Sequence, residues 1–203
     1  MNQLTLYKLF DRLFRQKRNE MFVSKMGVTP DTTILDVGGT SSFWEKMAIR
    51  PQVTLLNVFE DKASTFPQIV GSACSLPFED GAFDIVFSNS MIEHLETWEN
   101  QVLAAREIRR VGKRYWVQTP SRYFPIDPHF LTPFFHWLPS TLQRRFIRFT
   151  LWAVISKPTP DCCQTELRQI RLLDIRELRI LFPDCRIITE KLFGMIKSCM
   201  AVY

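Results

Sequence analysis

The segment over residues 33–40, which reads T-I-L-D-V-G-G-T, is the first group in the sequence that could do chemistry. An apolar, β-branched run contains Asp36 near its end, and Gly38 and Gly39 follow directly. A buried strand that runs into a glycine turn is how open α/β sheets bring backbone groups up to a nucleotide-like ligand. Glycine permits the tight turn and the close approach because it has no Cβ atom. Taken alone, the segment also fits an ordinary strand followed by a turn.

Two of the three histidines are candidates for proton transfer. His94 follows Glu93 shortly after an apolar run, and His129 lies two residues after Asp127 in F-P-I-D-P-H-F. A carboxylate beside an imidazole can orient the ring and make it more basic. We therefore predict that His94 and His129 are catalytic residues on the acceptor side of a site. The alternative for each is a histidine that packs against or caps its own element.

Further candidates for contact with a substrate stand near Asp127, just past a predicted strand. Arg122 suits an anionic group such as a carboxylate or a phosphate, and Tyr123 is its neighbour. His136 is flanked by aromatic residues and is predicted to pack. No carboxylate-rich or paired-cysteine cluster is present in the sequence, so no metal ligands are predicted, although a metal site can also be assembled from residues that are far apart in sequence.

The elements that must position these residues alternate between strands and helices. Apolar runs predict strands over 33–37, 53–58, 69–70, 82–87 and 114–119. Helical periodicity predicts helices over 2–25, 43–49, 97–110 and 174–182, with Ser41 and Ser42 as caps of the second. This alternation predicts a parallel sheet wound on both faces. Two closing strands, 186–192 and 197–202, are joined by a short turn and predict an antiparallel pair.

Length and composition predict one domain over residues 1–203. The chain is 46% hydrophobic, which is enough for a full core. Residues 1–28 are predicted as a basic amphipathic N-terminal segment. Residues 120–163 are predicted as an inserted lid that is rich in aromatic residues, proline and arginine. Five cysteines without paired spacing, and a charged N-terminus without a secretory pattern, predict a cytoplasmic protein.

Residues 34–40 and the later stretch G-S-A-C-S-L-P-F-E-D-G-A-F-D-I-V-F-S-N-S-M-I-E-H (71–94) together resemble a known family. They are similar to the S-adenosylmethionine-dependent methyltransferases with a Rossmann-like fold, in particular the small-molecule, ubiquinone-biosynthesis type. The resemblance covers about 32–119. It implies an α/β fold with a doubly wound seven-stranded sheet, mostly parallel with an antiparallel last strand.

The resemblance also implies the cofactor, S-adenosyl-L-methionine, and the positions that bind it. The implied cofactor-binding residues are Asp36, Gly38, Gly39, Asn57, Ser72, Ala73 and Ser88. Two of them depart from the family pattern. Asn57 stands where a carboxylate usually takes the ribose hydroxyls, and Ser72 where an acid usually meets the adenine. Thr40 and Ser41 replace further glycines in the turn.

The resemblance predicts a methyltransferase that acts on a small or lipid-linked acceptor, first on oxygen, with nitrogen or carbon as the alternative atoms. Arg122, Tyr123 and Asp127 are the predicted acceptor contacts. A non-catalytic module that binds the same cofactor is the first alternative, since Asn57 and Ser72 are altered. An RNA methyltransferase is the second, because the net charge is +5, although no RNA-binding module is recognisable. The basic and aromatic lid also suggests peripheral contact with a membrane.

Overall fold

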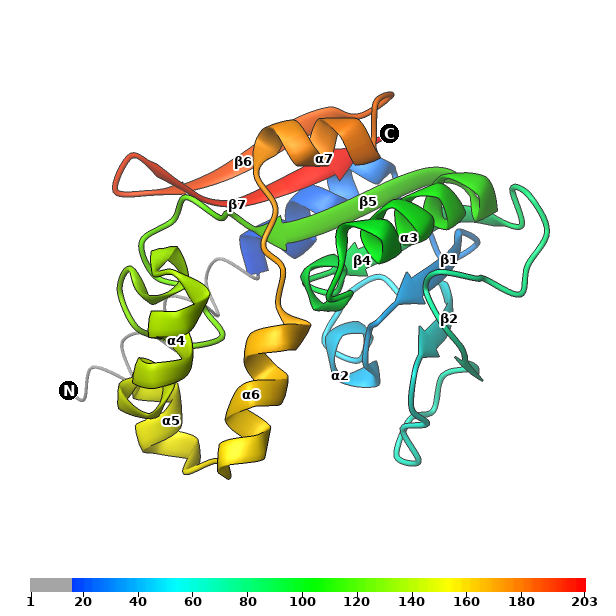
Figure 1. Ribbon diagram of the computed structural model, residues 1–203. Coiled ribbons are helices and arrows are strands. Elements are labelled where there is room, and N and C mark those ends of the chain that lie inside the picture. Colours follow the sequence, from blue (N-terminus) through cyan, green and yellow to red (C-terminus); the bar gives the residue numbers. More distant parts are fainter. Residues whose placement is uncertain (1–15) are drawn as a thin grey trace.

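The computed structural model of the protein describes residues 16–203. They form a seven-stranded sheet in the order β3-β2-β1-β4-β5-β7-β6 (Figure 1). The strands are β1 (Thr33–Val37), β2 (Gln52–Asn57), β3 (Gln68–Val70), β4 (Phe83–Asn89), β5 (Gly112–Pro120), β6 (Arg186–Leu192) and β7 (Met195–Val202). Only β7 runs against its neighbours β5 and β6, which confirms the predicted sheet with its reversed last strand.

The winding of the sheet reverses between β1 and β4. Strand β1 pairs in parallel with β2 on one side and with β4 on the other. The chain therefore winds outward in opposite directions from this pair. In open α/β sheets, ligands bind in the crevice outside the carboxyl ends of the strands at such a reversal. The turn after β1 and the segment after β4 both lie at this edge.

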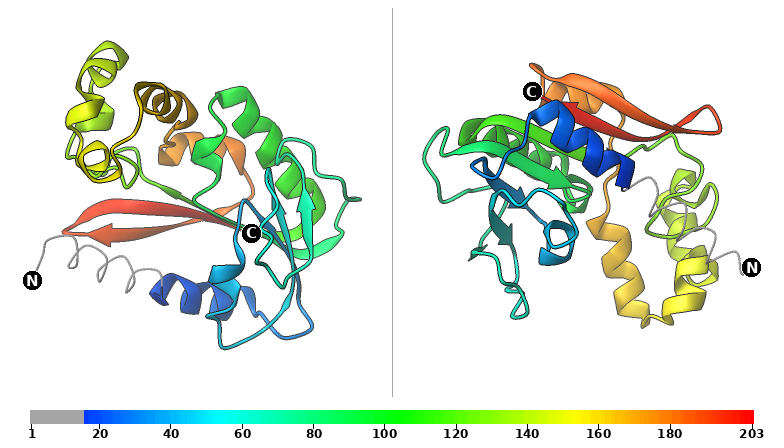
Figure 2. Two further views of the ribbon diagram at one scale, coloured as in Figure 1. Left: turned by 90° about the horizontal axis from the view of Figure 1, so that it is seen from below. Right: turned by 180° about the vertical axis from the view of Figure 1, so that it is seen from behind.

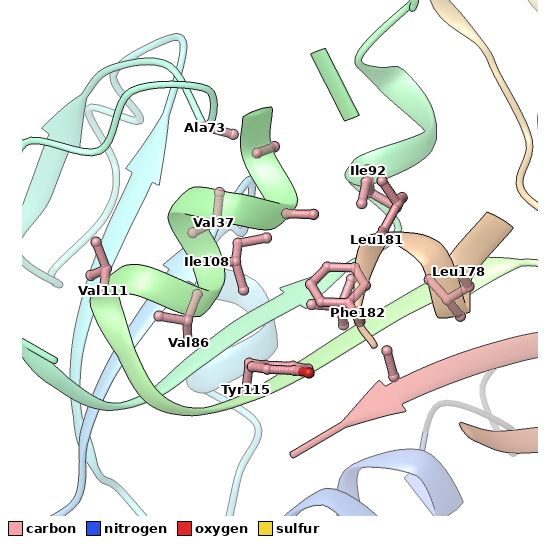
Figure 3. Packing of buried hydrophobic residues seen from close by; sticks show 14 of the residues in the cluster. Val37, Ala73, Val86, Ile92, Ile108, Val111, Tyr115, Leu178, Leu181 and Phe182 are labelled. Atoms are coloured by element: carbon pink, nitrogen blue, oxygen red, sulfur yellow. The ribbon is translucent and has the colours of Figure 1, made fainter. Parts of the chain in front are cut away.

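Helices cover both faces of the sheet (Figure 2). On one face, α3 (Trp98–Val111) and α7 (Ile175–Leu181) pack over a cluster that includes Val86, Ile108 and Phe182 (Figure 3). The side chain of Thr97 caps α3, and Asp174 forms a capping box with Glu177 at the start of α7. On the other face, the helix over residues 16–26 and α2 (Ser41–Trp44) enclose a second cluster.

The closing hairpin turns within two residues, Phe193 and Gly194. Both have positive φ angles, +51° and +78°. Two-residue hairpin turns of this kind match the right-handed twist of the strands that they join. Phe193 occupies a conformation that is uncommon for a bulky side chain.

The predicted lid is helical and has a small core of its own. It contains α4 (Ser140–Phe146), α5 (Leu151–Ser156) and α6 (Pro160–Gln169), and the short 3₁₀ turns η2 (Phe135–Trp137) and η3 (Ile147–Phe149). Phe130, Phe135, Ile147 and Cys163 form its buried cluster. The lid helices lie to one side of the sheet, as Figure 1 shows. Helix α6 runs on to Gln169, six residues beyond the predicted end of the insertion.

The second predicted helix is shorter than expected and begins earlier. It covers Ser41–Trp44 in place of 43–49, with Thr40 at the capping position and no hydrogen bond from a capping side chain. Pro51 restricts only Arg50, the residue directly before it, so it does not account for an end at Trp44. The first half of the predicted N-terminal helix lies outside the described residues. Among residues 16–203, no helix combines the length and apolar character needed to cross a bilayer.

Candidate active site

The turn after β1 requires both of its glycines. Gly38 has a φ of +82°, and a Cβ atom added there would lie 2.2 Å from Cγ of Met91. A Cβ atom on Gly39 would lie 1.7 Å from Oδ2 of Asp36. The Met91 and Asp36 side chains therefore pack directly on the backbone of this turn, and the residue type is fixed by close approach as well as by conformation.

Asp36 is a buried acid with one unused oxygen. Only 1% of the residue is exposed, and Oδ2 accepts a 2.7 Å hydrogen bond from Nε1 of Trp44. Oδ1 has no hydrogen-bond partner among the described residues. Burial raises the pKa of Asp36 to about 7, and the hydrogen bond from Trp44 offsets only part of that effect. A cation beside Oδ1 would stabilise the ionised form.

Asn57, at the end of β2, is engaged within the protein. Its Nδ2 donates to the backbone oxygen of Gly39 at 3.3 Å, and its Oδ1 accepts from the backbone N–H of Val58 at 2.8 Å. The amide therefore ties the end of β2 to the glycine turn. Its predicted contact with a ribose is a separate role that stays a prediction.

The remaining predicted cofactor residues differ in exposure. Ser72 is exposed and its Oγ accepts from the backbone N–H of Cys74. Ala73 is buried in the core cluster under α3. Ser88, the second-last residue of β4, is fully buried, and its hydroxyl has no hydrogen-bond partner in the described structure. These three positions remain predictions as cofactor contacts.

The two predicted histidines meet. His94 closes the 3₁₀ turn η1 (Ile92–His94) after β4, and His129 precedes the lid cluster. Their Nε2 atoms are 3.2 Å apart. On its other side, Nδ1 of His129 is 2.6 Å from Oδ1 of Asp127, which also accepts from the backbone N–H of His129. Residues separated by 35 positions thus form one chain of hydrogen bonds, Asp127–His129–His94.

The surroundings push the pKa values of the two rings apart. Burial alone would lower the pKa of His129, but the hydrogen bond and the charge of Asp127 outweigh it and raise that pKa. Burial and the neighbouring charge of His129 lower the pKa of His94. A proton taken up by the pair therefore resides on His129, which Asp127 stabilises.

Glu93 is a buried member of this site that the sequence pattern did not indicate as a site residue. It is fully buried, and Oε2 accepts a 3.0 Å hydrogen bond from the hydroxyl of Thr119 in β5. Oε1 has no partner among the described residues. Burial raises the pKa of Glu93 to about 7. An acid directly before a candidate histidine was the available signal, but its burial could not be seen in the sequence.

The other predicted acceptor residues face different partners. The Arg122 guanidinium is 4.0 Å from Glu177 of α7, and the Tyr123 hydroxyl donates to Asp174 at 3.1 Å. His136 lies in η2, and its Nε2 is 3.1 Å from the backbone oxygen of Arg122. Asp127 is the one of the three predicted acceptor contacts that joins the histidine pair.

Comparison with known proteins finds one profile that matches part of the chain. Residues 35–115, from β1 into β5, match the profile of a methyltransferase domain. A search of curated proteins found no significant match.

Solved structures share the fold at low sequence identity. One is described as a putative zinc-dependent alcohol dehydrogenase from Rhodobacter sphaeroides (14% identity, TM-score 0.64, covering 92% of this chain and 87% of that one). Another is a protein from Pyrococcus horikoshii (18%, TM-score 0.60, 95% and 89%). A third is a SAM-dependent methyltransferase from Methanosarcina mazei (15%, TM-score 0.51, 86% and 92%). At these identities the likeness shows the fold alone.

The family match indicates S-adenosylmethionine as the cofactor, and the described residues fit it. The turn of Gly38 and Gly39 lies at the reversal of the sheet, where such ligands bind. Beside it, Oδ1 of Asp36 is a buried acceptor without a donor among the described residues. The ammonium group of the cofactor would supply such a donor. These residues are the ones that would hold the amino-acid tail.

Proposed function

We propose that this chain, which carries an S-adenosylmethionine-dependent methyltransferase domain, transfers a methyl group to an oxygen atom of a small or lipid-linked acceptor. The observation that carries the proposal is the chain Asp127–His129–His94, which ends in an exposed imidazole just after β4. The carboxyl ends of β1 and β4 are adjacent. A proton acceptor next to a cofactor crevice is what the methylation of a hydroxyl group requires.

When bound, S-adenosylmethionine supplies a methyl group that is already activated by a sulfonium. The residues of the chain then need to align the acceptor and remove its proton. Asp36 and the glycine turn would hold the tail of the cofactor. Nδ1 of His129 donates to Asp127, so the lone pair of neutral His129 is on Nε2. The hydrogen bond between the rings is then donated by Nε2 of His94 and accepted by Nε2 of His129. The acceptor proton would pass by way of His94 to His129.

The lid supports a lipid-linked acceptor. Its outer surface exposes large apolar side chains, among them Phe149 (77% exposed) and Val154 (60%). A groove of about 200 Å³ beside Phe149 is lined mainly by Phe134, Phe135, Leu138 and Phe146. The exposed Arg144, Arg145 and Arg148 stand among these residues. Apolar anchors with adjacent cations are the pattern of an interfacial helix on an anionic membrane.

Flotation with liposomes tests the lipid-linked version. We expect the protein to float with vesicles that contain anionic lipid at low salt, and less of it to float at high salt. Phe149→Ser should reduce flotation. Ile180→Ser, which replaces an exposed apolar side chain on α7, outside the lid, should not. Protein that stays in the soluble fraction at low salt would remove the membrane contact and leave a small soluble acceptor.

Calorimetry with S-adenosylmethionine and S-adenosylhomocysteine tests the enzyme itself. We expect binding of both, followed by transfer of labelled methyl to hydroxyl acceptors. His129→Gln should lower the transfer rate by about 10²–10⁴-fold with little change in cofactor affinity. His136→Gln is the matched control, since this histidine bonds a lid carbonyl. Failure to bind either cofactor form would refute the proposal.

A non-catalytic module that binds the cofactor is the second candidate. It is favoured by Asn57, whose amide is already engaged by the backbone of Gly39 and Val58, and by Met91, which packs against Gly38. Binding of S-adenosylhomocysteine without methyl transfer to any hydroxyl, amine or carbon acceptor would support it.

A further inference from the structure

Among the described residues, Glu93, His94 and His129 bring three potential metal ligands together. One carboxylate oxygen and the two imidazole nitrogens all lie within 4.8 Å of one another. We propose that these three residues bind a divalent transition-metal ion of the zinc class. The inference rests on the proposed function, because it assigns a further component to the same acceptor site.

The distance between the two rings already suits a shared ion. Metal–nitrogen distances of about 2.0–2.1 Å place two ligands of one ion about 2.9–3.4 Å apart, depending on the coordination geometry. The Nε2 atoms of His94 and His129 are 3.2 Å apart. The carboxylate of Glu93 would have to move by about 1–2 Å to complete the set, given the 4.8 Å limit.

The groups behind the ligands are those that a metal site needs. A ligating histidine generally donates its second ring N–H to a carboxylate, which fixes the tautomer and leaves the other nitrogen free for the ion. Asp127, which is 2% exposed, accepts from Nδ1 of His129 in this way. Thr119 holds Oε2 of Glu93 and leaves the buried Oε1 without a partner. A cation would compensate that unpaired oxygen.

Two imidazoles and one carboxylate are a ligand set of catalytic zinc sites, which keep a further position open. His94 is exposed, so an ion and an oxygen ligand can enter from solvent. The sequence predicted no metal because its ligands come from two distant segments. While an ion is bound, the lone pair on Nε2 of His129 is not available to take a proton, so the metal and the free base are exclusive roles.

Metal binding to the full chain tests the inference directly. Zn²⁺ affinity is measured by competition with a chromogenic chelator, in a Cys162→Ser background because Cys162 is exposed. We expect one tight site per chain. His94→Gln, His129→Gln and Glu93→Gln should each weaken it by more than about 100-fold, and Asp127→Asn by about 10–100-fold. His136→Gln is the matched control and should bind like the parent protein.

Co²⁺ substitution gives a second readout that a structural role would not change. The parent and His136→Gln should show the visible absorption of a four- or five-coordinate ion, which His129→Gln should lose. Equal Zn²⁺ affinity of the parent and His129→Gln would overturn the inference. Cofactor binding and methyl transfer are measured in parallel. Because the ion and the free base exclude each other, chelator-treated protein should transfer methyl. Full transfer together with the absence of a tight Zn²⁺ site would overturn the metal and leave the proposed function standing, whereas failure to bind either cofactor form would overturn the function alone.

Discussion

Replacement of Gly39 by alanine puts the packing of the turn after β1 to a direct test. The new Cβ atom would meet the Asp36 carboxylate at 1.7–2.4 Å, so this buried side chain must move and release the hydrogen bond from Trp44. Loss of a hydrogen bond in the interior costs about 1–3 kcal/mol. Overpacking costs about 1–3 kcal/mol more. We expect the free energy of unfolding to fall by about 2–6 kcal/mol.

Urea unfolding measures this loss. With an m value of about 2–3 kcal/mol/M, the midpoint should fall by about 0.7–3 M. Gly71→Ala is the matched control, because its Cβ atom would make only an ordinary 3.6 Å contact with Leu56. The affinity for S-adenosylhomocysteine should fall in Gly39→Ala and be retained in Gly71→Ala. Equal midpoints and equal affinities of the two variants would refute the close packing of Asp36 on Gly39.

Three further predictions follow from the ionisation and the backbone geometry. Since the pKa of Asp36 is about 7, cofactor affinity should rise about tenfold from pH 6 to pH 8 as the carboxylate ionises, and calorimetry on Asp36→Asn should find no such rise. Asp127→Asn should lower the pKa of His129, and an unchanged NMR titration of that ring would contradict the assigned hydrogen bond. Phe193→Asn should raise the free energy of unfolding by about 1 kcal/mol, because asparagine tolerates the positive φ and Phe193 is 86% exposed; thermal melting that shows no gain would count against this strain.

The layout of the sheet was predictable because its strands carry short apolar runs between turn residues. β1 contains Ile34, Leu35 and Val37, and β4 contains Ile85, Val86 and Phe87, and these runs can be recognised in the sequence without tertiary information. The length of α2 was not predictable from periodicity. Trp44 is its last residue, and the indole of Trp44 donates to Asp36 in the interior, which no periodicity indicates.

The members of the site were predictable in part, and their contacts were not. His94 and His129 were selected from their neighbours in sequence, yet their 3.2 Å contact depends on how the chain enters the lid. Glu93 could not be identified from the sequence, because it is distinguished by its burial, and burial depends on how the helices pack on the sheet. Similarly, the amide of Asn57 bonds backbone groups whose positions no side-chain pattern encodes.

The two rings of the histidine pair are attached to different packed bodies. His129 is followed directly by Phe130, a member of the separate lid cluster, whereas His94 follows Ile92, which belongs to the central core. If the lid moved outward, the imidazole of His129 would move away from the imidazole of His94. Entry of a bulky acceptor would then be coupled to the contact between the two histidines. With the lid open, the methyl donor would lie beside a site that lacks one of its two imidazoles.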